Sequence, residues 1–534
     1  MASEDASCPI NCLPTEVLAE VFHWCILHVR AAVDGTSSHL APPAPYSWLS
    51  VRAVCRHWRA VALSYPTLST HIWLTRVSCV DSIIKLSGHL PLHVYAIDRA
   101  PSELHEEDAE LLGLVLRVSQ RIAHAKFTLS KDTIDLLFSL GQDAFPHLSS
   151  LSFHVAEFWS PSELLFPNIA FPALRKLECQ NLFLVRSLST ITSPRLHSLR
   201  LVGCQTTLKG QLLPLLQQLP GLEELVLKRA LHDYSQTLEV HEILILPPNP
   251  LQMAALPHLK LLHIDEDSGD LVVMLIKYLS FPRSASMRLK AHWFSHFQLP
   301  SATYLSVLLV GLVEAAPQTL LVSCDPERFT LSLWDARLPA SDAPTPRVVP
   351  PRFSCTYDSP PAPFVADVIS ALPLRHISSA YLDERPVAHW SAPHWASLLA
   401  RTPALEELSL RYETFDVVSP GAAPYRAPPI VPPRLPNLKR VEICEMYHRS
   451  SARADFESNT AHLGVIAAAL QSHAGVDLSK RRENFHGAQT CRCVVQGESR
   501  TFGDPTPRAA RAAQGAGWKG AVKEYVARLS SLFK

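Results

Sequence analysis

Three stretches of the sequence hold residue types that bind metal ions, but their spacing does not suit a metal. Cys491 and Cys493 have no second cysteine pair at zinc spacing, and the same holds for Cys8 and Cys12. The acidic run 265–270 has the composition of a calcium-binding loop. However, its glycine stands fifth rather than sixth, and an isoleucine takes the twelfth position, where a bidentate glutamate belongs. The spacing therefore predicts no metal site.

Catalytic motifs with a defined spacing are also missing from the sequence. It contains no G-x-x-x-x-G-K-[ST] phosphate loop, no G-x-S-x-G nucleophile turn and no H-E-x-x-H zinc motif. Two His-Trp pairs, 389–390 and 394–395, favour packing or an interface. The 25 histidines mean that a catalytic triad can be neither built nor excluded. We expect a protein that is not an enzyme and uses no cofactor.

Composition narrows the remaining classes of function. The chain has 534 residues, which predicts two to four domains, and its Lys+Arg and Asp+Glu totals are equal at 49. This balance gives no electrostatic argument for nucleic acid or a membrane surface as partner. The N-terminus lacks the basic region of a signal peptide, and the most apolar window, 304–313, is too short to span a bilayer. Scattered cysteines without a glycosylation sequon indicate a reducing compartment, the cytoplasm or the nucleus or both.

Two amphipathic helices are predicted near the start of the chain. In 10–30, Pro14 suits a first helical turn, and apolar residues then recur from Val17 to Cys25 at helical spacing. In 48–74, apolar residues from Val51 to Ala62 repeat that spacing, with arginines on the opposite face. Each apolar stripe needs a partner surface. An ordinary helical hairpin with both stripes in its own core is the alternative interpretation.

Motifs in these two helices resemble the F-box family. They read Leu13-Pro14-x-Glu16-Val17-Leu18-x-x-Val21-Phe22 and Val51-x-x-Val54-Cys55-Arg56-x-Trp58-Arg59-x-Val61-Ala62, followed by a Ser-Tyr-Pro-Thr-Leu ending found in fungal F-box-like proteins. The resemblance covers residues 1–75 and implies a helical bundle that docks on the Skp-type adaptor and, through it, on a cullin. Residues 31–47 separate the motifs by more than a compact F-box needs. The residues expected to mix adaptor contacts with the core of the bundle are Leu13, Pro14, Val17, Leu18, Phe22, Val51, Cys55 and Trp58.

Residues 76–144 are predicted to form a mostly helical linker. Ser102 suits a helix N-cap, and acidic residues crowd the first turns of a helix that we expect to run to about Arg121. Apolar residues at helical spacing between 111 and 122 give this helix its buried face.

A phrase of the form Pro-x-Leu-x-x-Leu-x-Φ, where Φ is apolar, recurs from residue 145 onward. Clear copies begin at Pro146, Pro172, Pro194, Pro220, Pro257, Pro403 and Pro436, and the first four prolines lie 26, 22 and 26 residues apart. Alternate leucines point inward on a short strand, and stacked neighbours bury them. The region 145–476 resembles a leucine-rich-repeat array, with proline-rich insertions at 339–363 and 417–436. Unrelated amphipathic α/β units are the alternative.

The predicted fold class is therefore an α plus α/β protein, with a helical F-box bundle followed by an irregular leucine-rich-repeat solenoid. Residues 477–534 form a basic tail, with 11 Lys/Arg against 5 Asp/Glu, whose last helix is expected to cap the array. The solvent-facing strand positions Arg175, Arg200, Glu224 and Glu407 are predicted to bind an unidentified protein target. The chain is interpreted as the substrate-recognition subunit of a Skp–cullin–F-box ubiquitin ligase, or alternatively as a repeat scaffold acting outside a ligase.

Overall fold

The computed structural model describes most of the chain between residues 13 and 495. The described residues are 13–33, 46–97, 106–129, 145–155, 171–181, 193–204, 206–231, 253–293, 316–324, 328–338, 350–358, 372, 374–384, 398, 400–414, 437–448, 477–486 and 490–495. The predicted terminal helix and most of both proline-rich insertions lie outside them.

A small helical bundle forms the N-terminal part of the described chain. It contains α1 (Thr15–Val33), the 3-10 helix η3 (Ser47–Ala53), α2 (Arg56–Ser64) and the 3-10 helix η4 (Pro66–Ser69). Cys55 is the N-cap residue of α2, and its Sγ accepts the backbone N–H of Trp58 at 3.4 Å. The rings of Phe22 and Trp58 pack at 5.2 Å, and Leu18 and Ile26 are buried beside them in the core. The predicted helical pair is present.

Tyr46 attaches this bundle to the sheet that follows. Its hydroxyl donates to the carbonyl of Trp73 at 2.7 Å and accepts the backbone N–H of the same residue at 2.8 Å. The two rings also pack edge-on at 5.3 Å. Because both bonds are buried, the bundle is joined to the first strand by a specific, satisfied polar contact.

One curved sheet of 17 strands runs through the rest of the described chain, with helices between some of its strands. The strands are β1 His71–Trp73, β2 Leu92–Ile97, β3 Ile122–Leu129, β4 Ser150–Val155, β5 Lys176–Gln180, β6 Ser198–Val202, β7 Glu224–Lys228, β9 Leu261–Ser268, β11 Ser286–Trp293, β12 Thr319–Cys324, β13 Arg328–Trp334, β14 Phe353–Asp358, β15 Ser379–Glu384, β16 Glu407–Thr414, β17 Arg440–His448, β18 Asp477–His486 and β19 Thr490–Val495. Neighbouring strands pair in parallel and in chain order from β1 to β11 and from β15 to β18. This parallel ladder is compatible with the predicted solenoid.

The middle of the sheet reverses this order. β11 pairs with β14, and the strands then run back through β13 to β12 in antiparallel pairs before β12 pairs in parallel with β15. At the far end β19 also pairs antiparallel with β18. An antiparallel meander therefore joins two parallel segments of the sheet.

The recurring phrase builds the same turn before many strands. The carbonyl of the residue before the proline accepts the N–H of the following leucine, as in Phe171 to Leu174 at 3.1 Å and Leu219 to Leu222 at 3.1 Å. Proline at the second position of such a turn already has the required φ. The proline therefore belongs to the turn and not to the strand, because Pro172 comes four residues before Lys176, the first residue of β5.

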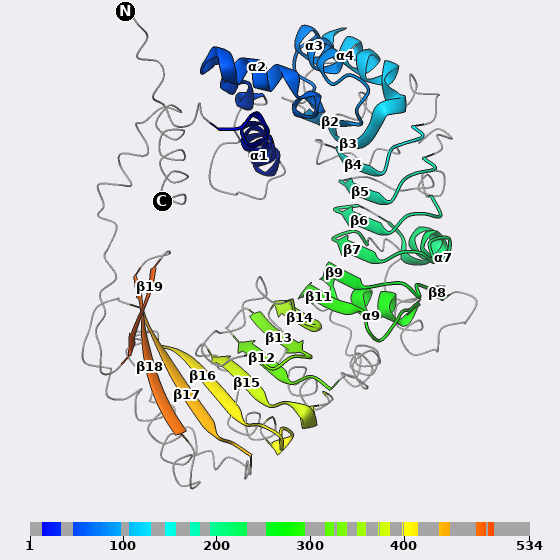
Figure 1. Ribbon diagram of the computed structural model, residues 1–534. Coiled ribbons are helices and arrows are strands. Elements are labelled where there is room, and N and C mark those ends of the chain that lie inside the picture. Colours follow the sequence, from blue (N-terminus) through cyan, green and yellow to red (C-terminus); the bar gives the residue numbers. More distant parts are fainter. Residues whose placement is uncertain are drawn as a thin grey trace, which may run out of the picture.

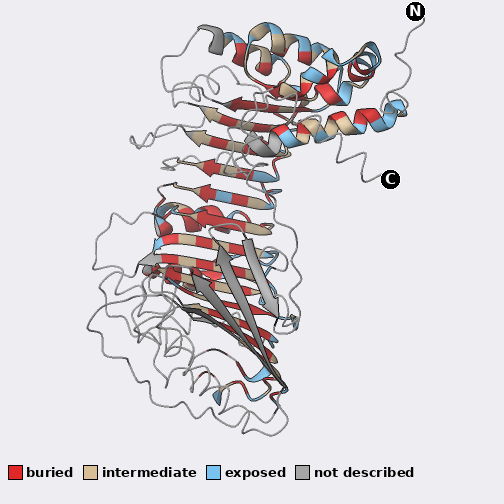
Figure 2. Cartoon of the chain, turned by 90° about the vertical axis from the view of Figure 1, so that its left-hand side faces the viewer, coloured by how far each residue is buried: buried red, intermediate tan, exposed pale blue. Residues whose placement is uncertain are grey.

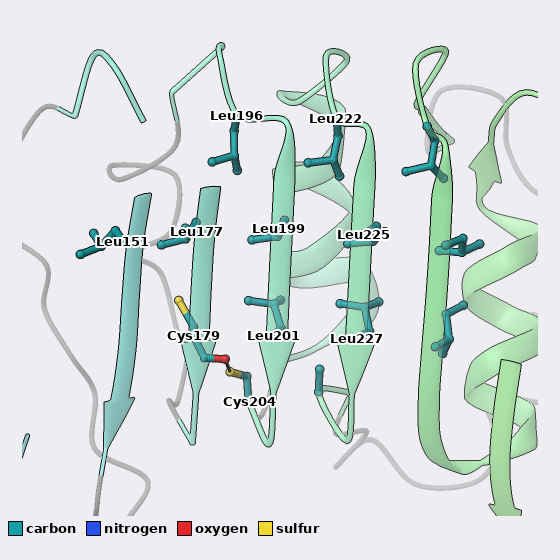
Figure 3. Close-up of a cluster of buried hydrophobic side chains, with 14 of the residues drawn as sticks. Leu151, Leu177, Cys179, Leu196, Leu199, Leu201, Cys204, Leu222, Leu225 and Leu227 are labelled. Atoms are coloured by element: carbon teal, nitrogen blue, oxygen red, sulfur yellow. Dashed lines mark hydrogen bonds between the residues drawn. The ribbon is translucent and has the colours of Figure 1, made fainter. Parts of the chain in front are cut away.

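On the strands that follow these turns, the leucines of neighbouring strands stack in rows. Leu177, Leu199 and Leu225 form one row, and Leu201 and Leu227 belong to the next, all of them buried (Figure 3). Helices α7 (Leu213–Gln217) and α9 (Gly269–Lys277) lie on the outer side of the arc, and the strands line its inner side (Figure 1). The outer side also carries the two-stranded sheet of β8 (Ala254–Ala255) and β10 (Leu279–Ser280).

Two segments differ from the prediction. Residues 76–144 contain helices α3 (Val77–Leu86) and α4 (Glu106–Arg117), but also strands β2 and β3, which the prediction of a mostly helical linker did not include. Residues 477–495 were assigned to a tail, yet β18 and β19 extend the sheet. Strands β2 and β3 lack the proline phrase, and β18 becomes a strand by pairing with β17. The division of the chain into domains stays a prediction.

Figure 2 shows that buried positions alternate with intermediate ones along many described strands, whereas the helices near the N-terminus mix buried and exposed positions. No helix among the described residues is both long enough and apolar enough to cross a membrane.

Candidate protein-binding surfaces

The eight residues predicted to serve the adaptor or the core separate into two groups. Leu18 and Phe22 on α1 and Val51 and Trp58 on η3 and α2 are buried, and they form the core of the bundle. The other four remain accessible to a partner: Pro14 and Val17 are exposed, and Leu13 and Cys55 are half-buried. Contact of any of these residues with an adaptor stays a prediction.

The bundle also exposes large apolar side chains. Among the described residues these are Val17 at 45%, Trp24 at 61%, Val54 at 58% and Leu63 at 46% exposure, and all four lie in the helical bundle. Val17 and Trp24 are seven residues apart on α1 and share one helical face with half-buried Val21. The opposite face of α1 carries the buried Leu18. Helix α1 is therefore apolar on two sides, only one of which the chain covers.

Three of these four residues were not among the predicted adaptor contacts. Trp24, Val54 and Leu63 were passed over because the sequence pattern favoured the buried stripe. The available signal was the spacing from Val17 to Trp24, since a tryptophan placed opposite a core stripe has no intramolecular reason to be there.

Arg59 lies four residues before the exposed Leu63 on α2, so these two side chains are neighbours on one helical face. Arg52 stacks over the ring of Trp48, with 5.3 Å from the guanidinium carbon to the ring centroid, and Arg59 Nε donates to the Arg52 carbonyl at 2.9 Å. Burial lowers the pKa of Arg52, while the neighbouring Cys79 thiol opposes this shift. This part of the bundle presents cationic and apolar groups together.

The four predicted target-binding residues occupy three different settings. Arg200 lies on the inner face of β6, where Nε pairs with Glu178 at 3.2 Å, and Glu224 on β7 accepts the hydroxyl of Ser198 at 3.1 Å. Glu407 begins β16 and pairs with Arg337 at 2.8 Å. Arg175 is exposed but precedes β5. The structure does not gather them at one point, and their role in target binding stays a prediction.

The acidic run 265–270 serves the fold through separate contacts. Asp265 pairs with Lys290 at 3.6 Å, and Asp267 pairs with Arg229 at 3.3 Å. Between them, Glu266 is buried and accepts the backbone N–H groups of the preceding loop, with 2.9 Å to Ala230. No three His, Cys, Asp or Glu side chains within the described ranges come close enough together to hold a metal ion.

Burial raises the pKa of the Glu266 carboxyl to about 8, although its bonds from Ala230 and Leu231 oppose the shift. Cys204, just after β6, makes a comparable contact with the neighbouring strand: its thiol donates to the carbonyl of Cys179 on β5 at 3.2 Å (Figure 3). Both side chains satisfy backbone groups where the chain leaves a strand, so we assign them to the fold rather than to a site.

Comparison with known families assigns the bundle to a class. Residues 10–75 match the F-box-like family, a segment that includes α1, η3, α2 and the first strand. The match covers only this N-terminal part of the chain. A search of curated proteins gave no match to the sequence.

Proposed function

We propose that the protein is the substrate-recognition subunit of a Skp–cullin–F-box ubiquitin ligase. Its F-box-like bundle binds the Skp-type adaptor, which connects it to the cullin, and its sheet binds a protein target. In this proposal the chain contributes no catalytic group and works in the cytoplasm or the nucleus. It accelerates ubiquitin transfer by raising the effective concentration of the target near the charged ubiquitin carrier.

The observation that carries the proposal is where the exposed apolar side chains lie. Val17, Trp24, Val54 and Leu63 all belong to the segment that matches the F-box-like family. Exposed apolar groups gathered in one part of a molecule mark a protein interaction site. Tryptophan is enriched among the residues that dominate binding energy, so we expect Trp24 to be the central contact.

We further propose that the sheet is an irregular leucine-rich-repeat solenoid. The same hydrogen-bonding step recurs along it: one carbonyl accepts two successive N–H groups of the next strand. The carbonyl of His197 accepts from Glu223 and Glu224, and that of Ser378 accepts from Glu406 and Glu407. The step therefore appears on both sides of the antiparallel meander. Such arrays present a continuous inner face to other proteins.

Co-purification with a Skp-type adaptor tests the function. The full chain should retain the adaptor and a cullin, and the double substitution Trp24→Ala with Leu63→Ala should reduce adaptor binding by about thirtyfold or more. Both side chains are exposed, so the variant should fold normally.

The matched control is Lys85→Ala, an exposed residue on α3 outside the bundle, which pairs with Asp81 at 2.5 Å. It should leave adaptor binding unchanged. If the wild-type chain retains no adaptor, the ligase function is wrong and a scaffold outside a ligase becomes the better hypothesis. If the double variant binds as well as the wild type, the assignment of the exposed apolar residues is wrong.

A further inference from the structure

The inner face of the sheet consists of the residues that alternate with the buried leucines. The strand register aligns these residues in three rows that cross β3 to β11. The rows are His124, Ser150, Lys176, Ser198, Glu224, Leu261 and Ser286; Lys126, Ser152, Glu178, Arg200, Val226, His263 and Arg288; and Thr128, His154, Gln180, Val202, Lys228, Asp265 and Lys290. Adjacent residues in a row lie about 4.8 Å apart, so their side chains act on one surface.

Positive charge predominates in these rows, although the chain as a whole is neutral. Across the whole sequence, basic and acidic residues are equal at 49 each. The rows carry six basic residues, Lys126, Lys176, Arg200, Lys228, Arg288 and Lys290, and three acidic ones, Glu178, Glu224 and Asp265. The inner face therefore favours an anionic partner.

The acidic residues leave part of this positive charge unpaired. Glu178 pairs with Arg200 at 3.2 Å and Asp265 pairs with Lys290 at 3.6 Å. Arg288, in the same row as Arg200, has a buried Nε that makes no hydrogen bond within the described part of the chain. Neither of these two ion pairs involves Arg288, so its guanidinium charge adds to the positive charge of the row, which attracts an anion.

His263 lies in the same row as Arg200 and Arg288, and the nearby cations affect its pKa. The pKa of His263 is lowered to about 4, mainly by burial and also by Lys228, Arg288 and Arg200, while Asp265 opposes the shift. Val226, next to it in the row, is buried. The centre of the inner face thus has an apolar floor and a neutral imidazole surrounded by cations.

We propose that the inner face from β5 to β11 binds an extended segment of a protein rich in glutamate and aspartate. Its carboxylates would lie against Lys228 and Arg288. The five strands span about 19 Å, which an extended chain covers with about six residues. The acidic residues already in the rows favour discrete, spaced carboxylates over a continuous nucleic acid backbone. The inference deepens the proposed function by naming the chemistry of its target, and it rests on that function only in taking the sheet as the target-binding part.

Fluorescence anisotropy with the full-length protein tests this inference. The probe is a fluorescein-labelled peptide of about ten residues that alternates Glu and Ser, and its matched control carries Gln in place of Glu. The Glu peptide should bind at least about tenfold more tightly than the Gln peptide, and its affinity should fall as salt is raised. Equal binding of the two peptides would overturn the proposal.

Two further probes identify the source of the negative charge. A peptide with phosphoserine replacing Ser and Gln replacing Glu supplies phosphate groups without carboxylates, and a fluorescein-labelled single-stranded DNA supplies a nucleic acid backbone. Both should bind more weakly than the Glu peptide. Tighter binding of either one would replace the acidic segment with that ligand and overturn the proposal.

Substitutions locate the binding surface. Lys228→Gln with Arg288→Gln should weaken Glu-peptide binding at least about tenfold. The control is Lys260→Gln, because Lys260 is exposed on the loop before β9 and pairs with Glu223 at 2.7 Å outside the three rows. Unchanged binding by the double variant would overturn the proposal. Thermal unfolding of each variant confirms that it is folded.

The adaptor and peptide experiments can fail independently. Lys228→Gln with Arg288→Gln should retain the adaptor, and Trp24→Ala with Leu63→Ala should retain the peptide. A protein that binds the peptide but no adaptor contradicts the proposed function alone. A protein that binds the adaptor but not the peptide contradicts this inference alone.

Discussion

The N-terminal bundle and the sheet handle their apolar residues in opposite ways. In the bundle, α1 buries Leu18 and Phe22 on one face and exposes Val17 and Trp24 on another. In the sheet, the described large apolar residues are buried or half-buried, and the inner face is mostly polar and charged. Both regions are built from amphipathic elements, but among the described residues only the bundle has large apolar side chains that are exposed.

This difference indicates two kinds of partner. Burying an apolar surface in a complex lowers the free energy because the surface is removed from water. Binding of this kind depends little on salt. A charged surface such as that around Arg288 acts through Coulomb attraction, which salt screens over about 10 Å at 0.1 M. We therefore expect the complex with the adaptor to persist at raised salt, and the complex with an acidic target to dissociate.

The largest expected effect contrasts two tryptophans in the bundle. Trp58→Ala removes a buried ring that packs on Phe22 at 5.2 Å and should lower the free energy of unfolding by about 3–5 kcal/mol. Trp24→Ala removes an exposed ring and should change it by less than about 0.5 kcal/mol. Urea denaturation of the full chain, followed by circular dichroism, measures both. Equal destabilisation would mean that Trp24 is part of the core, and the bundle would then lack its apolar surface.

A second substitution asks whether the leucine rows are the equivalent core of the sheet. Leu201→Ala should cost about 2–5 kcal/mol, because Leu201 is fully buried in the row that contains Leu227. Lys176→Ala, at an exposed inner-face position, is the control and should be nearly neutral. Hydrogen exchange of the β6 amides gives the local measurement. Slow exchange maintained in Leu201→Ala would contradict the assigned role of the row.

The sequence predicted where many strands lie better than it predicted which strands pair with one another. The phrase at Pro172, Pro194 and Pro220 correctly indicated strands β5, β6 and β7, because the turn and the leucine spacing are local. It did not indicate β2 or β3, where the phrase is absent. The antiparallel meander of β12 to β14 was also missed, since pairing between distant strands sets its order.

The candidate sites show the same limit. Helical spacing identified α1 and its buried stripe, but which face of α1 meets η3 and α2 depends on packing. The spacing from Val17 to Trp24 indicated a second apolar face, but only the packing shows that Trp24 is exposed. On the sheet, Arg200 was selected as a solvent-facing residue, whereas Arg288 was not, because only the register aligns the two in one row.

Glu266 should make the free energy of unfolding of the sheet depend on pH. Burial raises the pKa of its carboxyl from the ordinary 4.5 to about 8, so between these values the folded state holds a proton that the unfolded state has released. The contribution of Glu266 to the unfolding free energy is therefore greatest below pH 4.5 and falls as pH rises towards 8.

Glu266→Gln should remove this fall, because a glutamine amide does not titrate. Hydrogen exchange of the Ala230 and Leu231 amides, which bond to Glu266, measures the local opening free energy at pH 5 and pH 8 after correction for the intrinsic exchange rate. Wild type should show a smaller opening free energy at pH 8, and the variant should not. Identical pH profiles would show that Glu266 does not titrate in this window.

Substitution of Gly203, at the bend after β6, should have a smaller effect on the free energy of unfolding. The φ of Gly203, +61°, is left-handed, and a Cβ added there would meet the Asn181 side-chain oxygen at 2.5 Å. Gly203→Ala should cost about 1–3 kcal/mol, and adding Asn181→Gly, which suits the left-handed φ of residue 181, should recover the part due to the clash. Thermal unfolding of the single and double variants measures both terms. An unchanged melting temperature in Gly203→Ala would mean that this bend is not held as described.

The smallest expected effect concerns the exposed ion pairs of the second parallel segment. Arg337 pairs with Glu406 at 2.7 Å and with Glu407 at 2.8 Å, and Lys439 pairs with Glu406 at 3.0 Å. Arg337→Gln should lower the unfolding free energy by no more than about 1 kcal/mol at low salt, and by less at 0.5 M salt. It should not affect the Glu-peptide affinity, since Arg337 lies outside the three rows. A loss of peptide binding in Arg337→Gln would show that the target-binding surface extends beyond the first parallel segment.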